Sequence, residues 1–161
     1  MDGHATWGEL SRERPDLTEG GRSLLYQVGV GLGFLATIRP DSGPRLHPFC
    51  PILSDSGMYG FIIVSPKQRD LQRDGRYTVH SFPTPDNEDA FSVSGRVEVV
   101  RDAARRQTLG EQFVSERASL GVPFPADDDL LVEFHIDRCL LTRTTGFGDW
   151  NPQHQVWRHP A

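Results

Sequence analysis

A lysine at the start of a short helix is the residue whose position points most directly to chemistry. The run Ser65-Pro66-Lys67-Gln68 begins this helix: Ser65 is a good N-cap, Pro66 suits the first helical position, and Gln68 can close a capping box. The exposed N–H groups and the positive dipole end of a helix attract anions. Lys67 is unfavourable there unless an anion such as a phosphate lies between it and the helix. The alternative is that Lys67 extends into water, as most lysines do.

The other titratable residues show no spacing that predicts a reaction. The six histidines have no zinc-site spacing, so His80 and His135 are interpreted as packed or exposed strand residues rather than metal ligands. The run 127–129 of three aspartates is interpreted as a solvated loop, because adjacent carboxylates make a poor cation cage. There is no Gly-x-Ser-x-Gly elbow to support a hydrolase. We therefore predict no metal and name no catalytic residue.

Composition narrows the class of protein. With 161 residues, 37% hydrophobic and 24% charged, the chain can bury one core of its own. A net charge of -5 without a basic stripe argues against nucleic acid as a partner. No segment approaches the roughly 20 apolar residues that span a bilayer, and the first residues lack the pattern of a secretory signal. Cys50 and Cys139 have no CxxC spacing and are expected to be apolar strand residues. We expect a cytoplasmic protein that acts on a small molecule and binds no membrane.

The expected elements are helices first and then mostly strands. Thr6 and Glu9 form a possible capping box, and a second helix is expected from Thr18 to Gln27. Helices are also predicted over 66–74, ended by a left-handed Gly75, and over about 103–120, ended at residue 121. The strand pattern predicts strands at 33–38, 45–53, 58–64, 77–82, 91–100, 130–136, 139–144 and 155–158.

The second of these segments contains two prolines, Pro48 and Pro51. Because proline cannot donate a hydrogen bond to a neighbouring strand, this strand should be at an edge, bulged, or unpaired near a ligand. The short strands and hairpin-length turns predict a mainly β fold, a six- to seven-stranded antiparallel barrel with accessory helices. We expect one domain over 1–161: an N-terminal helical segment (1–28), a barrel with inserted helices (33–145) and a C-terminal tail with a short strand (146–161).

Three segments resemble one known family. The segment 33–48 (GFLATIRPDSGPRLHP) resembles the opening hairpin of the pyridoxamine 5'-phosphate oxidase-like flavin-binding split barrels. The segment 65–79 (SPKQRDLQRDGRYTV) resembles that family's helix and next strand, in which a lysine holds the flavin phosphate. The ending 156–160 (VWRHP) is similar to the family's aromatic and basic terminus. Their order and spacing agree from Leu24 onward, so the resemblance implies a split barrel of the FMN-binding type.

The resemblance also implies a homodimer with each cofactor held at the subunit interface. By position, residues 47–50 would lie beside the flavin ring and ribityl chain, the backbone of 61–63 at the ring edge, 65 and 67 at the phosphate, and 157–158 near the partner's cofactor. The implied cofactor-binding residues are His47, Pro48, Phe49, Cys50, Phe61, Ile62, Ile63, Ser65, Lys67, Trp157 and Arg158.

The sequence departs from the family pattern in three places. His47 stands where the oxidases proper carry an arginine, and a neutral histidine offers no fixed charge. Phosphate binding would then depend on Lys67, Ser65 and the helix end. The ring-edge segment 61–63 has no hydroxyl side chains. The family's full set of C-terminal basic residues for the substrate phosphate is not found, which argues against pyridoxamine phosphate as the substrate.

The resemblance therefore implies an FMN-dependent oxidoreductase that transfers hydride or electrons to a small molecule the sequence does not identify. One alternative is a reductase that uses a deazaflavin. Another is a non-catalytic flavin- or haem-binding protein, for which His47, His80, His154 and His159 are candidate haem ligands. A third is a dimer whose cofactor site has decayed and whose role is structural.

Overall fold

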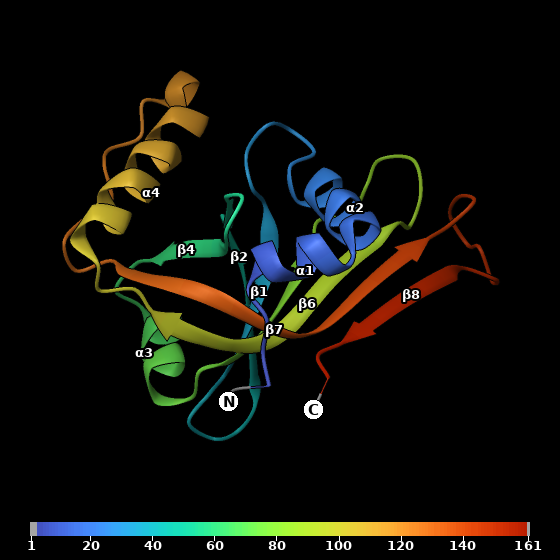
Figure 1. The fold of residues 1–161 in the computed structure, drawn as a ribbon, viewed down its shortest axis with the longest axis horizontal. Helices are drawn as coiled ribbons and strands as arrows, with labels where there is room; N and C mark the ends of the chain where they lie inside the picture. The colour runs from blue at the N-terminus through green and yellow to red at the C-terminus, as the bar shows by residue number, and fades with distance from the viewer. Residues whose placement is uncertain (1–2, 161) are drawn as a thin grey trace.

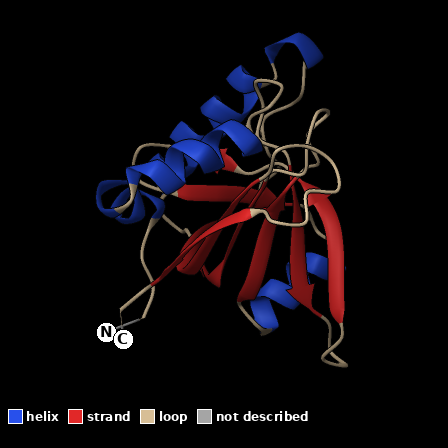
Figure 2. Cartoon of the chain, turned by 90° about the vertical axis from the view of Figure 1, so that its right-hand side faces the viewer, coloured by secondary structure: helices blue, strands red, loops and turns tan. Residues whose placement is uncertain are grey.

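The computed structural model describes residues 3–160, which form one antiparallel sheet of eight strands with four α-helices and a short 3₁₀ helix (Figure 1). In Figure 2 the larger helices lie together at the upper left of the curved sheet, and a short helix lies apart from them at its lower right. The elements are α1 (Trp7–Glu13), α2 (Pro15–Leu25), β1 (Gly33–Ile38), β2 (Pro44–Phe49), β3 (Ile52–Leu53), β4 (Met58–Ile62), α3 (Pro66–Arg73), β5 (Arg76–Ser81), β6 (Ala90–Val99), α4 (Ala103–Glu116), η1 (Ala118–Leu120), β7 (Leu130–Arg143) and β8 (Gln153–Arg158).

The strand order makes an open barrel. The main path runs β2-β1-β5-β6-β7-β4-β3, and β8 also pairs with β7. The two edges, β2 on one side and β3–β4 on the other, are not hydrogen-bonded to each other. The mainly β, antiparallel split barrel that the sequence predicts is therefore confirmed. The sheet has eight strands rather than the predicted six to seven: of the eight segments expected along the chain, the proline-rich 45–53 forms two strands, whereas 130–136 and 139–144 form one.

The core lies inside the curved sheet and is rich in aromatic rings. Trp7 and Phe91 meet edge to face with ring centroids 5.9 Å apart, and Tyr77 and Phe134 meet at 4.7 Å. A smaller apolar cluster fills the space beneath α4; its buried members are Ile52, Tyr59, Leu109 and Leu131. Burial of these apolar side chains supplies the main favourable free energy of folding.

The N-terminal helices pack together against β6 and β7 (Figure 1). The predicted capping box at Thr6 and Glu9 is present, with the Thr6 N–H donating to the Glu9 carboxylate at 2.7 Å. The prediction that the second helix starts at Thr18 was wrong. It begins at Pro15, because proline fits the first helical position and Arg14 serves as the N-cap residue.

The start of α3 agrees with the sequence prediction, but its other details differ. Ser65 is the N-cap. The Gln68 side chain does not close a capping box; it donates to the carbonyls of Ile62 and Asp128 at 2.8 and 3.0 Å. The helix ends in an extended Asp74, and Gly75 is not left-handed.

One long strand replaces two that the sequence separates. The predicted strands at 130–136 and 139–144 are a single strand, β7, whose register with β6 shifts between Ser94 and Gly95. Asp137 is the extra residue of this bulge, and Arg138 pairs with Ser94 beyond it, so the strand does not end there. The helix predicted over 103–120 is shorter than expected: α4 ends at Glu116, and the 3₁₀ helix η1 follows it and ends at the left-handed Gly121. No helix of the described chain is long and apolar enough to cross a bilayer.

Candidate functional site

The end of β2, the end of β4 and the start of α3 converge at the opening of the barrel. A Cβ built on Gly60 of β4 would lie 3.4 Å from the Phe49 ring, so the Phe49 side chain reaches from the end of β2 to β4. β2 pairs with β1 alone among the described strands. Its outer edge therefore keeps backbone N–H and carbonyl groups that can bind a ligand.

Lys67 is half-buried at this junction. Burial lowers the pKa of Lys67, and the neighbouring Cys50 opposes the shift, which places the ammonium near the end of β2. Within residues 3–160 no carboxylate forms an ion pair with Lys67. A partly desolvated cation without a carboxylate partner is an arrangement that suits a bound anion.

Ser65 joins the end of β4 to the start of α3. Its hydroxyl donates to the Ile63 carbonyl at 2.8 Å and accepts from the Gln68 N–H at 3.4 Å. The hydroxyl thus fixes the turn from which Lys67 projects.

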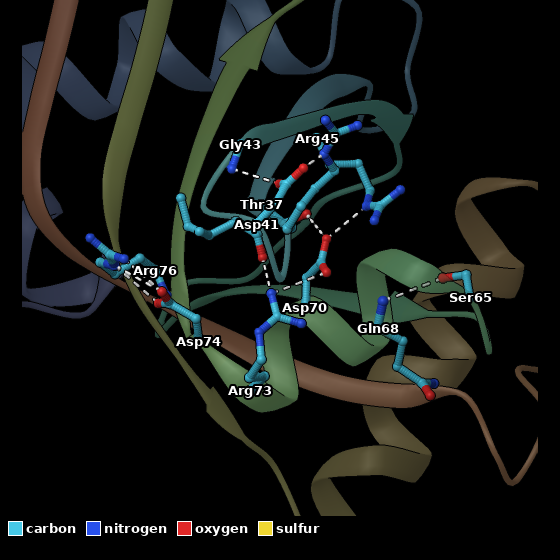
Figure 3. Close-up of polar contacts among 12 residues, drawn as sticks. Thr37, Asp41, Gly43, Arg45, Ser65, Gln68, Asp70, Arg73, Asp74 and Arg76 are labelled. Atoms are coloured by element: carbon cyan, nitrogen blue, oxygen red, sulfur yellow. Dashed lines mark hydrogen bonds and ion pairs between the residues drawn. The ribbon is translucent and has the colours of Figure 1, made fainter.

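An ion-pair network anchors α3 from its other side (Figure 3). The Asp70 carboxylate, only 2% exposed, accepts from Thr37 Oγ1 at 2.8 Å and from Arg45 Nε at 2.7 Å. Arg73 lies 3.3 Å from the same carboxylate and also donates to the Ile38 carbonyl. Burial acts to raise the pKa of Asp70, but the hydrogen bonds from Arg45, Thr37 and Arg73 outweigh it and lower the pKa.

This network holds α3 against the β1–β2 hairpin, so it determines where Lys67 sits relative to β2. Sequence reasoning missed it. Thr37 and Asp70 are 33 residues apart and Arg45 and Asp70 are 25 apart, so no local pattern links them. The only signal was a charge-rich helix, which normally indicates a solvated surface.

The β2 residues predicted to line the cofactor split between surface and core. His47 and Pro48 are exposed, and Cys50 is half-buried. Phe49 is buried, with its ring 5.6 Å from that of Phe134. The Phe49 side chain therefore belongs to the core and is not available to a ligand.

The predicted ring-edge residues alternate in the same way. Ile62 is buried, Phe61 is half-buried and Ile63 is 58% exposed. These side chains offer no hydrogen bonds, so a ligand at this edge would meet backbone groups and apolar surface.

The two C-terminal site residues differ in their surroundings. Trp157 is 6% exposed, and its indole N–H donates to Glu13 Oε1 at 2.8 Å. Its side chain is engaged inside its own chain, whereas Arg158 is exposed.

An apolar cavity lies beside the ring-edge strand and was not predicted. Its volume is about 450 Å³, and it opens between β4, α4 and the loop after η1. The Arg106 guanidinium stacks over the Phe61 ring at 5.3 Å, next to this space. The lining residues are Phe61, Ile63, Phe113, Val122, Pro123, Phe124, Pro125, Ala126 and Asp129. The one sequence signal was the apolar, proline-containing run 122–125 after the helix.

No family model matches the chain, and no curated protein matches it in sequence. Solved structures do match its fold. A haem-binding protein from Mycobacterium smegmatis superposes with a TM-score of 0.64 and 12% identity, over 87% of this chain and 57% of that one. A Clostridium acetobutylicum protein related to general stress protein 26, of the pyridoxinephosphate oxidase family, gives 0.60 and 12% over 94% and 95%. An F420 reductase gives 0.52 and 21% over 71% and 90%. The chain shares the split-barrel fold of these proteins, in agreement with the family resemblance seen in its sequence.

Proposed function

We propose that this chain binds a flavin, FMN in the first instance, at the opening between β2 and β4, and uses it to oxidise or reduce a small molecule. The observation that carries the proposal is Lys67: a half-buried cation at a helix start, with no carboxylate partner in the described chain. Flavin phosphate would supply the missing negative charge.

Each part of the opening has a role in this proposal. Lys67 and the first turn of α3 would bind the phosphate, and Ser65 would hold that turn in place. His47, Pro48 and Cys50, with the backbone of Phe49, would follow the ribityl chain and ring. The backbone of residues 61–63 would meet the ring edge. A bound flavin supplies the hydride chemistry, so the protein needs to orient it, exclude water and admit a substrate.

The apolar cavity beside Phe61 is the proposed substrate space. Its volume and lining suit an apolar or aromatic small molecule rather than a phosphorylated one.

A second copy of the chain would complete the site. Leu46, Ile63 and Val64 are 63%, 58% and 56% exposed around the opening, an apolar surface that a partner could cover. In such a homodimer the exposed Arg158 could reach the partner's cofactor. Trp157 would act only indirectly, by fixing β8.

Both cysteines are free, which agrees with the reducing cytoplasm as the proposed location.

The test is a titration of the purified chain with FMN, in which quenching of flavin fluorescence measures binding. Lys67→Ala should weaken binding by about 10- to 100-fold, as for loss of a charge-assisted hydrogen bond. Arg69→Ala is the matched control, because Arg69 is an exposed cation on the same helix. Equal affinity in wild type and Lys67→Ala would refute the phosphate assignment.

The same titration with a deazaflavin and with haem separates the alternatives. The haem-binding protein and the F420 reductase share this fold, so both cofactors are worth testing. Saturable binding of either one, with no binding of FMN, would replace the FMN proposal. Light scattering of the purified protein gives the oligomeric state, and a monomer at all concentrations would exclude a shared site.

A further inference from the structure

On the outer face of β6 and β7, two carboxylates and an imidazole converge on one point. Glu98 stands directly opposite Glu133 in the β6–β7 pairing, and His135 follows two residues along β7 on the same face. His135 Nε2 lies 3.3 Å from a Glu98 carboxylate oxygen and 3.2 Å from a Glu133 carboxylate oxygen. None of the three belongs to the proposed cofactor site.

We propose that Glu98, Glu133 and His135 bind a divalent transition-metal ion, Zn²⁺ being the best fit. Their ligand atoms all lie within 4.8 Å of one another. Two ligand atoms on a tetrahedral zinc ion, each about 2.0–2.1 Å from it, are about 3.3–3.4 Å apart. The two nitrogen–oxygen distances therefore match the edges of a zinc coordination tetrahedron. Mixed carboxylate and imidazole ligands suit zinc better than magnesium or calcium, which prefer oxygen alone.

The histidine gives a second, independent indication. His135 Nε2 is sealed from solvent and makes no hydrogen bond of normal geometry within the described chain, although it faces two carboxylates. A buried polar atom without a hydrogen bond is costly. A metal ion at the meeting point would satisfy that nitrogen and both oxygens together.

The charges around the cluster also favour a cation. Like charges directly opposite each other in a sheet are destabilising, and Glu133 is nine-tenths buried, which increases the cost. Glu9 of α1 adds a third negative charge close to His135. Arg105 of α4 offers partial compensation, with its guanidinium 3.6 Å from Glu133 and its side chain 51% exposed. Arg96 of β6 lies directly opposite His135, so two arginines face three carboxylates and the face stays negative while His135 is neutral.

The site would be open on one side. Three protein ligands leave the fourth tetrahedral position for water or a ligand oxygen, which is the pattern of exchangeable rather than purely structural zinc. The Glu98 side chain is 71% exposed and can move aside, so it provides an entry path to the buried nitrogen. A bound ion would link β6 to β7 at the point where α1 and α4 approach them.

The experiment is calorimetric titration of chelator-treated, full-length protein with ZnCl₂, together with its melting temperature with and without zinc. Wild type should bind one equivalent with a micromolar or lower dissociation constant, and zinc should raise its melting temperature. Glu98→Gln and His135→Gln should each weaken binding by about tenfold or more. His154→Gln, an exposed histidine on β8, should bind as wild type does.

Two results would overturn the proposal. One is a wild type without saturable zinc binding, which would mean that His135 simply carries a proton shared by the two carboxylates. The other is wild-type affinity in Glu98→Gln, which would mean that zinc binds elsewhere. Glu98→Gln keeps the test valid if His135→Gln fails to fold, because the Glu98 side chain is mostly exposed. FMN affinity plays no part in either readout.

Discussion

Helix α3 presents two charged side chains, three residues apart, whose surroundings are opposite. Asp70 is buried and is satisfied by Thr37, Arg45 and Arg73. Lys67 is half-buried and has no carboxylate partner in the described chain. A charge whose neighbours already neutralise it anchors the fold, whereas a charge left without a partner is available to a ligand. Glu133 lies between these cases: Arg105 and His135 contact it, but another glutamate lies directly opposite it in the sheet.

The largest expected effect is on stability, at Asp70. Asp70→Ala leaves the partly buried Arg45 and the Thr37 hydroxyl without their partner, so it should lower the free energy of unfolding by about 3 kcal/mol. Urea denaturation measures this change. Asp74→Ala is the matched control, because its ion pair with the 58% exposed Arg76 should contribute no more than about 1 kcal/mol. Equal losses in the two variants would show that Asp70 is not an anchor.

The second expected effect is a pH dependence that belongs to Asp70. Its pKa is lowered from its usual 3.8, so the folded state binds this proton less readily than the unfolded state. The stabilisation is therefore fully present above the unfolded pKa and is lost as the pH falls through the folded pKa. Between about pH 5 and pH 3, wild type should lose more stability than Asp70→Asn, in which that titration is absent. Parallel curves would contradict the assignment.

A smaller effect is expected at the N-cap of α3. Ser65→Ala removes the hydroxyl that caps Gln68 and holds the Ile63 carbonyl, and should cost about 0.5–1 kcal/mol of unfolding free energy. Because the turn then loosens, FMN affinity should fall as well, though less than in Lys67→Ala. Thermal melts and the FMN titration measure the two effects on the same samples. A loss of stability without any change in affinity would separate the cap from the phosphate site.

The smallest effect on stability is expected at Lys67, and it is the most direct test of the difference between Lys67 and Asp70. Lys67→Ala should change the free energy of unfolding by no more than about 0.5 kcal/mol, because a cation near a helix N-terminus contributes little or nothing to stability. Urea denaturation without flavin tests this. A loss as large as that of Asp70→Ala would mean that Lys67 is structural and that the two sides of α3 do not differ.

Local sequence patterns predicted the individual elements well. The bounds of β1 agree with the expected 33–38, because a short apolar run bounded by turn residues is a local signal for a strand. The start of α3 was correct because Ser65 and Pro66 act within one turn. Errors arose where long-range contacts decide: β7 continues past Asp137 because this residue forms a bulge in its pairing with β6.

The sites were less predictable than the strands. The position of Lys67 could be read from the helix start, but the anchoring of α3 by Arg45 and Asp70 could not. His135 was interpreted as an ordinary strand residue because metal-ligand spacing was sought along one segment. Glu98 comes from the neighbouring strand, and only the pairing of β6 with β7 places it opposite Glu133. Trp157 was assigned to a partner's cofactor from the family resemblance, and its contact with Glu13, 144 residues away, has no local sequence signal.

The central place of β7 has a consequence for biosynthesis. β7 pairs with β4, β6 and β8, and its backbone also exchanges hydrogen bonds with Ala5. It begins only at Leu130, so during translation the earlier strands β4 and β6 must wait for it with unpaired edges. The Glu13–Trp157 hydrogen bond, across 144 residues, forms later still. Folding should therefore be slow and largely post-translational, and nascent chains stalled before Leu130 should depend on chaperones.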